Sequence, residues 1–289
     1  MSIRTILVPL SDATAEAGIL GTAFAVAETF NAHVDAFHLR ADPTRSISDI
    51  VGETVTPALV GETIKAAEDR AQRVATRVRK VFDESTAKAR IEIVNLPSAH
   101  EKPTASYGEE TGLKEYWVET RGRVSDLIVV RRPRNSTDFG ARTIAEYALM
   151  GTGRPVLLAP ATAPSEIGSS VAIAWNGSVE ASKAVASAMP FLMRARTVTA
   201  ISVVEKGSEG HNLDGLVQYL RWHGIRAKPA VVRSRRGDTG KAVRGAASRA
   251  KADLLVMGAY THSRIREMIF GGVTDHVLRA SRIPVLLAH

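Results

Sequence analysis

Asp253-Leu-Leu-Val-Met, followed by Ile283-Pro-Val-Leu-Leu-Ala-His, decides the fold because the chain contains an earlier copy of it. The earlier copy is Asp126-Leu-Ile-Val-Val, followed by Arg154-Pro-Val-Leu-Leu-Ala-Pro. The two Asp residues lie 127 positions apart and the two Pro residues 129 apart, so a whole unit has been duplicated. Where one copy keeps a residue type that a ligand or catalytic site requires and the other copy has lost it, the copy that keeps it is the better candidate for a functional site.

Length and composition indicate a globular protein with two domains. The 289 residues suit two units of ordinary size, each burying its own core, and 45% of them are hydrophobic. No apolar run approaches the roughly 20 residues of a membrane span, and the amino terminus carries no cleavable signal pattern. We therefore expect a cytoplasmic protein without a membrane partner. The absence of cysteine excludes disulfides, thiolate nucleophiles and cysteine-ligated zinc.

The formal charge of +8 would suit an anionic ligand or a nucleic acid. Arginines cluster at 131–134 and 233–236, just after predicted strands, but no aromatic residues that could stack on bases are interleaved with them. We therefore expect solvated loops there and no nucleic-acid partner.

Short apolar runs alternate with helical patterns throughout both halves, which is typical of parallel, doubly wound sheets. In the first half we expect strands at Thr5–Leu10, His33–Leu39, Ile91–Leu96, Leu127–Val130 and Val156–Leu158, helices at Ala13–Phe30, Glu62–Glu84, Leu113–Arg123 and Thr143–Met150, and a polar loop at Pro97–Gly112. In the second half we expect strands at Val171–Trp175, Val198–Val204, Ala227–Val232, Leu254–Met257 and Val285–Leu287, and helices at Val179–Met193, Leu213–Gly224, Asp238–Ala250 and Gly272–Ser281. The predicted fold class is α/β, with two tandem Rossmann-like domains that each hold a mainly parallel five-stranded sheet.

The domain boundary is predicted at Ala161–Gly168, where helix breakers combine with low hydrophobicity. The domains would then be residues 1–162 and 168–289. From Asp12 to Asp126 the first copy spans 114 residues, whereas the second spans 77 from Asn176 to Asp253. We expect the insertion in Asp42–Gly61 and Pro97–Gly112, where it could cover the carboxyl edge of the sheet or mediate assembly.

Glycines mark a candidate anion site in the second half. Gly258 ends a predicted strand, and Gly271-Gly272-Val273-Thr274 opens a helix 13 residues later. A glycine at a strand end lets the backbone approach a ligand, and a helix start offers unpaired N–H groups. This chemistry favours a phosphate.

At these residues the second half resembles the universal stress protein family of adenine-nucleotide-binding domains, whose fold is adenine nucleotide alpha hydrolase-like. The family signature is Gly, two residues, Gly, nine residues, then Gly and Ser or Thr. Gly258 and Gly271 match its outer positions, and the whole chain resembles a tandem member. Thr261 replaces the middle glycine, Gly272 replaces the hydroxyl residue, and Asn176 stands where the family usually has an Asp beside adenosine.

The resemblance implies an ATP or AMP site, with any Mg brought by the nucleotide. Phosphates would lie on Gly271–Thr274 and the nucleoside between Asn176, Val203 and Gly258. The implied site residues are Asn176, Val203, Gly258, Ala259, Thr261, His262, Arg264, Gly271, Gly272, Val273 and Thr274. The alternative is a glycine turn and helix cap in a domain that has lost its ligand.

The first half departs further from the pattern. Arg131 falls at the position of Gly258, and Arg142 and Thr143 fall at those of Gly271 and Gly272, although Asp12 matches the first-strand acid. We expect no phosphate cradle there, so this half is structural or binds something else.

Other motifs favour ordinary structural roles. Gly237–Ala242 lacks the leading glycine and the hydroxyl of a P-loop, so Asp238 or Thr239 is expected to cap a helix. The histidines show no metal-ligand spacing, and no nucleophile elbow accompanies Ser11 or His38. The aromatic residues at helical spacing are interpreted as packing residues: Trp117, Tyr147 and Trp222.

The resemblance implies a stress-response protein that acts by sensing a ligand or binding a partner. No motif places a general base or nucleophile, so we expect at most slow ATP hydrolysis; a slow ATPase and a ligand-free scaffold remain the alternatives. The apolar strands Val156–Leu158 and Val285–Leu287 would be hazardous if exposed. They could pair the two domains, making one chain equivalent to a dimer, and a homodimer of chains is also open.

Overall fold

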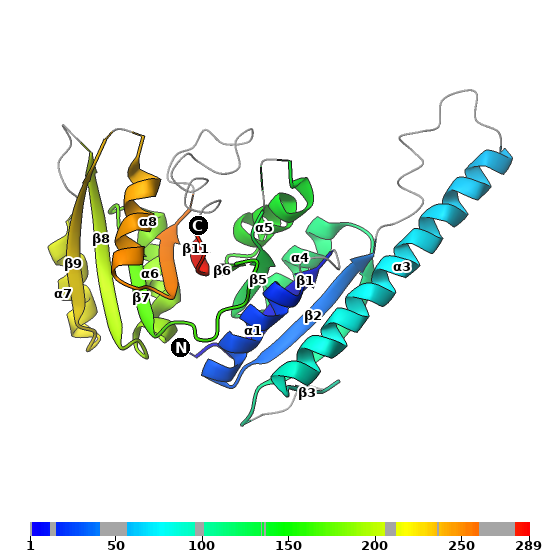
Figure 1. Ribbon diagram of the computed structural model, residues 1–289, viewed down its shortest axis with the longest axis horizontal. Coiled ribbons are helices and arrows are strands. Elements are labelled where there is room, and N and C mark those ends of the chain that lie inside the picture. Colours follow the sequence, from blue (N-terminus) through cyan, green and yellow to red (C-terminus); the bar gives the residue numbers. More distant parts are fainter. Residues whose placement is uncertain are drawn as a thin grey trace.

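A computed structural model describes residues 2–11, 16–40, 57–95, 101–133, 135, 137–205, 212–235, 237–259 and 281–289. These residues form one 11-stranded sheet in the order β3-β4-β2-β1-β5-β6-β11-β10-β7-β8-β9 (Figure 1). All neighbouring strands are parallel except β6 and β11, which are antiparallel. The α/β fold class predicted from the alternating pattern is confirmed.

The elements of each half follow the predicted order closely. The first half contains β1 (Thr5–Leu10), α1 (Glu16–Phe30), β2 (His33–Arg40), α3 (Pro57–Ala89), β3 (Glu92–Ile93), β4 (Thr104–Thr111), α4 (Lys114–Gly122), β5 (Leu127–Arg131), α5 (Phe139–Gly151) and β6 (Val156–Ala159). The second half contains β7 (Ser170–Ala174), α6 (Val179–Leu192), β8 (Thr197–Glu205), α7 (Leu213–Trp222), β9 (Ala227–Ser234), α8 (Thr239–Arg249), β10 (Leu254–Gly258) and β11 (Val285–Ala288). The expected helix at Gly272–Ser281 lies outside the described residues, apart from Ser281.

Helices cover both faces of the sheet. One buried cluster unites the sheet with α1, α3, α6 and α7, and a second unites the opposite face with α4, α5 and α8. The two halves meet along β6 and β11, where the fully buried Leu157 and Leu286 are register partners. The two apolar strands are therefore interior strands. Trp222, in contrast, is 84% exposed, so its interpretation as a packing residue was wrong.

The duplicated Asp residues have the same structural role in both halves. Asp126 N–H donates to Thr5 O at 3.0 Å, and Asp253 N–H donates to Ser170 O at 2.8 Å. Their carboxylates accept hydrogen bonds from the amides at the start of β1 and of β7: Arg4 and Thr5, and Gly168, Ser169 and Ser170. Both lie at the amino ends of the strands, away from the edge where ligands bind in such sheets.

The third strand was placed wrongly by the sequence pattern. Ile91–Leu96 contributes only the two-residue β3, whereas the expected polar loop contains the eight-residue β4. β4 pairs with β2 on one side and with β3 on the other. It therefore occupies the position in the first half that β9 has in the second.

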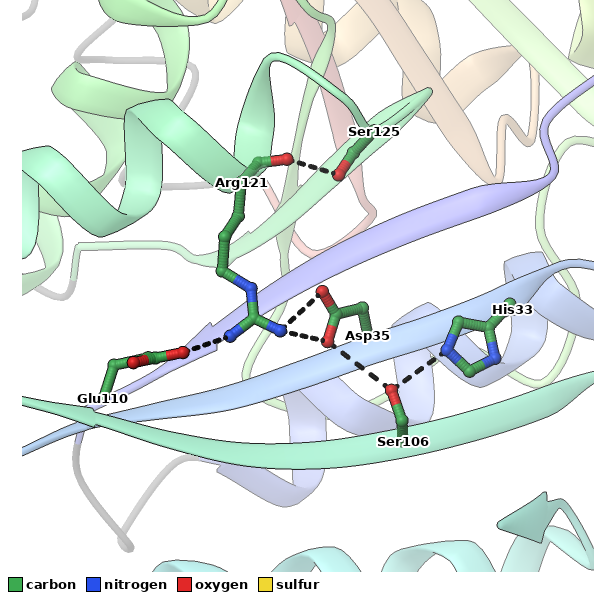
Figure 2. A network of polar contacts seen from close by, with 6 residues as sticks. All are labelled: His33, Asp35, Ser106, Glu110, Arg121 and Ser125. Atoms are coloured by element: carbon green, nitrogen blue, oxygen red, sulfur yellow. Dashed lines mark hydrogen bonds and ion pairs between the residues drawn. The ribbon is translucent and has the colours of Figure 1, made fainter. Parts of the chain in front are cut away.

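A polar network explains how the polar strand β4 is held in the sheet (Figure 2). Arg121 on α4 donates to both carboxylate oxygens of Asp35 at 2.9 and 3.0 Å and to Glu110 on β4 at 3.0 Å. His33 Nε2 lies 3.0 Å from the hydroxyl of Ser106, also on β4. These polar contacts hold β4 in the sheet although its sequence contains no continuous apolar run.

The insertion is largely helical. α3 has 33 residues, against 10 in α7 at the corresponding point of the second half. Val78 and Phe82 of α3 are fully buried in the core that also contains α1. Figure 1 shows the amino-terminal end of α3 projecting past the sheet. The helix predicted at Glu62–Glu84 is confirmed and extends further at both ends. Of the two segments in which the insertion was expected, 42–61 lies outside the described residues up to residue 56, and 97–112 contains β4. No described helix has the length and apolarity required to cross a membrane.

Candidate ligand crevice in the second half

The carboxyl ends of β10, β7 and β8 form the candidate crevice. Ala174 on β7 is the register partner of both Met257 on β10 and Ile201 on β8. Two residues further along each strand stand Asn176, Ala259 and Val203. The strand order reverses between β7 and β10, which is where open parallel sheets bind ligands.

Four of the predicted site residues therefore lie at one edge of the sheet: Asn176, Val203, Gly258 and Ala259. The other predicted site residues lie outside the described part of the chain, as does Asp12: Thr261, His262, Arg264, Gly271, Gly272, Val273 and Thr274.

Gly258 is a glycine because helix α6 lies against it. A Cβ at this position would be 2.5 Å from the amide nitrogen of Ala181 and 2.6 Å from the carbonyl carbon of Glu180. Such distances require the backbone to move. The approach of a ligand, expected from the sequence, is not needed to explain this glycine, because close packing of strand and helix is sufficient.

The turn after β7 is shaped by its own polar side chains. Asn176 Oδ1 accepts from the N–H of Ser178 at 3.2 Å, and Gly177 has a φ of +70°. Ser178 caps α6 by accepting from the N–H of Ala181 at 3.1 Å. The amide of Asn176 therefore orders the turn that forms one wall of the crevice.

Trp175 and Val203 lie on opposite faces of the sheet. The indole N–H of Trp175 donates to Asn212 O at 3.1 Å and so connects the end of β7 to the residue that caps α7. The partly buried Val203 packs with Ala174 on the face covered by α8. Of these two residues, only Val203 was a predicted contact of the ligand.

Two titratable residues in this crevice were not predicted from the sequence. Glu180 lies in the first turn of α6, and its pKa is lowered by its own backbone N–H, by Ser178 and by the charge of His289. His289 follows β11, and its Nδ1 lies 3.2 Å from Ala259 O. The sequence signal, an acid in the first turn of a helix, is too common to indicate a site.

The P-loop-like segment is capped by a residue from another strand. Glu205 at the end of β8 accepts from the hydroxyl of Thr239 at 2.6 Å and from the N–H of Gly237 at 3.4 Å. Asp238 makes no side-chain cap hydrogen bond, so the expected cap by this residue was wrong. A carboxylate of the chain itself occupies the start of α8.

In the first half an ion pair lies at the carboxyl end of β5. Arg131 donates to Asp138 at 2.5 and 2.9 Å, and the two side chains are only 15% and 16% exposed. The expectation of a solvated arginine loop was therefore wrong for Arg131. Together the two side chains place a neutralised pair of charges where the second half has Gly258.

Two further buried groups belong to the first-half crevice. His38 is 2% exposed, its Nδ1 lies 3.1 Å from Leu10 O, and burial is the largest cause that lowers its pKa. Glu16, in the first turn of α1, is also buried and accepts from the N–H of Ser11 at 2.9 Å. Both side chains therefore contact the backbone at the end of β1.

Arg132 extends from the first half to the second. Its guanidinium donates to the carbonyl oxygens of Ser281 and of Ile283, the latter at 2.7 Å. Burial lowers the pKa of Arg132 to about 10, so the side chain remains charged at neutral pH. The arginine fixes the segment that leads into β11. Among the described residues, no cluster of three or more His, Cys, Asp or Glu side chains could hold a metal ion.

The fold is that of a doubly wound α/β protein with a mostly parallel sheet, and its candidate ligand site lies at the carboxyl ends of β7, β8 and β10 in the second half. Residues 170–289 match the model of the universal stress protein family. A curated universal stress protein of Synechocystis, Slr1230, is 59% identical over 34 residues, which is 12% of this chain and 12% of that protein. The second half therefore carries a universal stress protein domain.

Solved structures of the same family share the fold over nearly the whole chain. A universal stress protein from Archaeoglobus fulgidus has a TM-score of 0.64 and 14% identity, covering 99% of this chain and 96% of that chain. A putative universal stress protein from Pseudomonas aeruginosa has a TM-score of 0.55 and 14% identity, covering 99% of this chain and 93% of that chain. The first half therefore shares this architecture, although the family model matches the second half alone.

Proposed function

We propose that the protein is a stress-response protein that binds an adenine nucleotide in its second half and acts by sensing that ligand or by binding a partner. The contrast between the two crevices carries the proposal. The second half has uncharged residues at its strand ends, namely Asn176, Val203 and Gly258. The first half has the ion pair of Arg131 and Asp138 at the end of β5. The half that keeps Gly258 is also the half that matches the family model.

The proposed site combines described and undescribed residues. The nucleoside would lie between Asn176, Val203 and Gly258, and the phosphates of ATP or AMP would lie on Gly271–Thr274. Any Mg would arrive with the nucleotide. The division into domains 1–162 and 168–289 belongs to the same proposal, with the first domain as a structural partner that is joined to the second through β6 and β11.

Calorimetric titration with magnesium-ATP and with AMP tests the proposal. We expect saturable binding to the full chain, lost in Val203→Trp and in Gly271→Trp because a bulky side chain would occupy the site. Val231→Trp is the matched control, since Val231 is a valine on β9 of the same half that is 65% exposed. Binding that persists in both site variants would contradict the site assignment.

The same samples distinguish the two alternatives. A slow ATPase would release phosphate from magnesium-ATP, and the Gly271→Trp variant would not. A ligand-free scaffold would show neither binding nor phosphate release with any of the proteins. We expect binding with little phosphate release, because the motifs place no general base at the site.

A further inference from the structure

β9 is an end strand of the sheet that the described residues form, and it is eight residues long. The strand at the opposite end, β3, has only two residues. A long end strand presents a row of backbone groups that another chain can pair with, so folded proteins usually shorten, cover or block such a strand. Figure 1 shows β9 at the outer end of the sheet, beside α7.

The backbone groups of β9 point alternately toward β8 and toward the open edge. Trp175 N–H donates to Ile201 O, so Ile201 on β8 faces β7, and Ser202, one residue further, faces β9. Ser202 is the register partner of Val231. In a parallel pair, a residue that faces the neighbouring strand bonds to the residues on either side of its register partner. Val231 therefore has its own N–H and C=O at the open edge.

The two ends of β9 differ in how this edge is protected. Pro229 faces the open edge as Val231 does but has no N–H, and the exposed Lys228 precedes it; proline and lysine are both common means of blocking strand addition. Beyond them, Val231 and Arg233 each offer an N–H and a C=O, and the side chain of Val231 is 65% exposed. The segment Val231–Ser234 is therefore open to the addition of one short strand.

The surroundings of β9 are basic. Between Asp214 and Asp238 the sequence contains six arginine and lysine residues and no acidic residue. The five of them that the structure describes are all exposed: Arg221, Arg226, Lys228, Arg233 and Arg235. Pairing of β9 with the β9 of a second copy would bring these like charges together, which is unfavourable. Charge complementarity favours a partner that carries acidic side chains.

Helix α7 adds apolar surface next to this edge. α7 packs on β9, and its residues Tyr219 and Trp222 are 43% and 84% exposed. Trp222 ends α7 shortly before β9 begins at Ala227. Large aromatic side chains are enriched where proteins bind partners. The partner should therefore present apolar as well as acidic side chains.

We propose that β9 accepts an extended segment of a partner protein, rich in acidic and apolar residues, as an additional strand along Val231–Ser234. The backbone of the segment bonds to Val231 and Arg233, and its carboxylates meet the exposed basic residues. A single-stranded nucleic acid would also be attracted by these charges and could stack on Trp222, but it has no peptide backbone to pair with the edge. The inference does not depend on the proposed nucleotide site.

Fluorescence anisotropy of labelled peptides with the full chain tests the proposal. The probe is a peptide of about eight residues in which Glu alternates with Val, long enough to form one strand. A second peptide has Pro in place of every Val and cannot form a strand, and a third has Lys in place of every Glu. We expect saturable binding of the first peptide alone, and its affinity should fall as salt is added.

Two variants separate the backbone contribution from the charge. Val231→Pro removes an N–H from the open edge and leaves the hydrogen bonds to β8 intact, so it should weaken binding of the acidic peptide at least about tenfold. Arg233→Glu should weaken it about three- to tenfold. Arg73→Glu is the matched control, since Arg73 is an exposed arginine on α3 in the first half, and this variant should bind as the wild-type protein does.

Amide hydrogen exchange of the wild-type protein gives a readout that requires no substitution. The N–H groups of Val231 and Arg233 should exchange at least about tenfold more slowly when the acidic peptide is bound, because they become hydrogen-bonded. Unchanged exchange at both amides would overturn the proposal, as would equal binding of the proline peptide or full affinity in Arg233→Glu.

The other outcomes also decide. An acidic peptide that does not bind the wild-type protein would overturn the proposal. A single-stranded RNA that binds more tightly than the acidic peptide and displaces it would overturn it in favour of a nucleic-acid surface.

Discussion

The carboxyl ends of β5 and β10 are hydrogen-bonded alike but carry different residues. Arg132 N–H donates to Ala159 O in the first half, and Ala259 N–H donates to Ala288 O in the second, which makes Arg131 the counterpart of Gly258. In one crevice a salt bridge occupies the end of the fifth strand, and in the other the first turn of a helix lies against a glycine. The two halves therefore share the pairing of these strands and differ in the side chains at the strand ends.

The neighbouring strands repeat this contrast. His38 on β2 is the register partner of Leu10 on β1. Ser202 on β8 comes directly after Ile201, which is the register partner of Ala174 on β7. The side chains of His38 and Ser202 are both buried, at 2% and 1% exposed. Because β6 and β11 are antiparallel, the carboxyl ends of the two halves lie at opposite edges of the sheet. The two crevices are therefore separate sites, and the loss of one does not imply the loss of the other.

The largest effect is expected at the seam that the two halves share. Leu286→Ala should lower the free energy of unfolding by about 3 kcal/mol, because a fully buried leucine leaves a cavity. Leu157→Ala, at its register partner, should cost a similar amount, and urea titration would measure both. If calorimetry of one variant shows two unfolding transitions, with only the half that carries the substitution unfolding at a lower temperature, the two halves are not one cooperative unit.

A smaller loss is expected where the crevices differ most. Gly258→Ala should lower the free energy of unfolding by about 2 kcal/mol, because the new methyl group overpacks the first turn of α6. Gly140→Ala is the control, since no heavy atom lies within 4 Å of a Cβ placed there. A Gly258→Ala protein as stable as the control would mean that the glycine is not required by packing.

The sequence predicted the fold where apolar side chains carried the signal. Strands such as β5 and β10 are buried on both faces, so continuous apolar runs revealed them. β4 was missed because its sequence, Thr104-Ala-Ser-Tyr-Gly-Glu-Glu-Thr, is polar and is held by Arg121 on another element. Strand prediction from local pattern does not include such long-range partners.

The candidate site was predictable only in part for the same reason. Gly258 and Asn176 were found because their residue types stand out at strand ends. Glu180 was not singled out, since an acid in the first turn of a helix is too common to stand out in a sequence. The partner of Arg131, Asp138, lies seven residues away and could not be distinguished from other nearby acids in the sequence.

The ion pair of the first crevice should contribute less than the packing of the second. Asp138→Asn should cost about 1 to 2 kcal/mol, between the values typical of exposed and of buried pairs, because the charge of Arg131 loses its partner. Arg131→Gln combined with Asp138→Asn should recover part of this loss. Chemical denaturation of the three variants gives the coupling energy, and a value near zero would show that the pair does not hold the crevice closed.

The smallest effect on stability is expected from the protonation of His38. The carbonyl of Leu10 can only accept, so the Nδ1–H form of the neutral imidazole donates to it. Burial lowers the pKa of His38 most strongly, and the charges of Arg40 and Lys114 lower it further, against an opposing effect of that hydrogen bond and of Glu109. Because the folded protein binds this proton more weakly than the unfolded chain, His38 should cost stability as the pH falls below about 6.5.

The slope from this residue cannot exceed about 1.4 kcal/mol per pH unit, the value for one proton. His38→Gln keeps a donor for Leu10 and does not titrate, so its free energy of unfolding should fall less than that of the wild-type protein between pH 7.5 and 5. Ser202, the corresponding buried residue of the second half, has no titratable group, which assigns the difference to the first crevice. If the free energy of unfolding changes with pH in the same way for both proteins, the imidazole of His38 stays neutral or is protonated without cost. The contrast between the two halves would then rest on Arg131 and Gly258 alone.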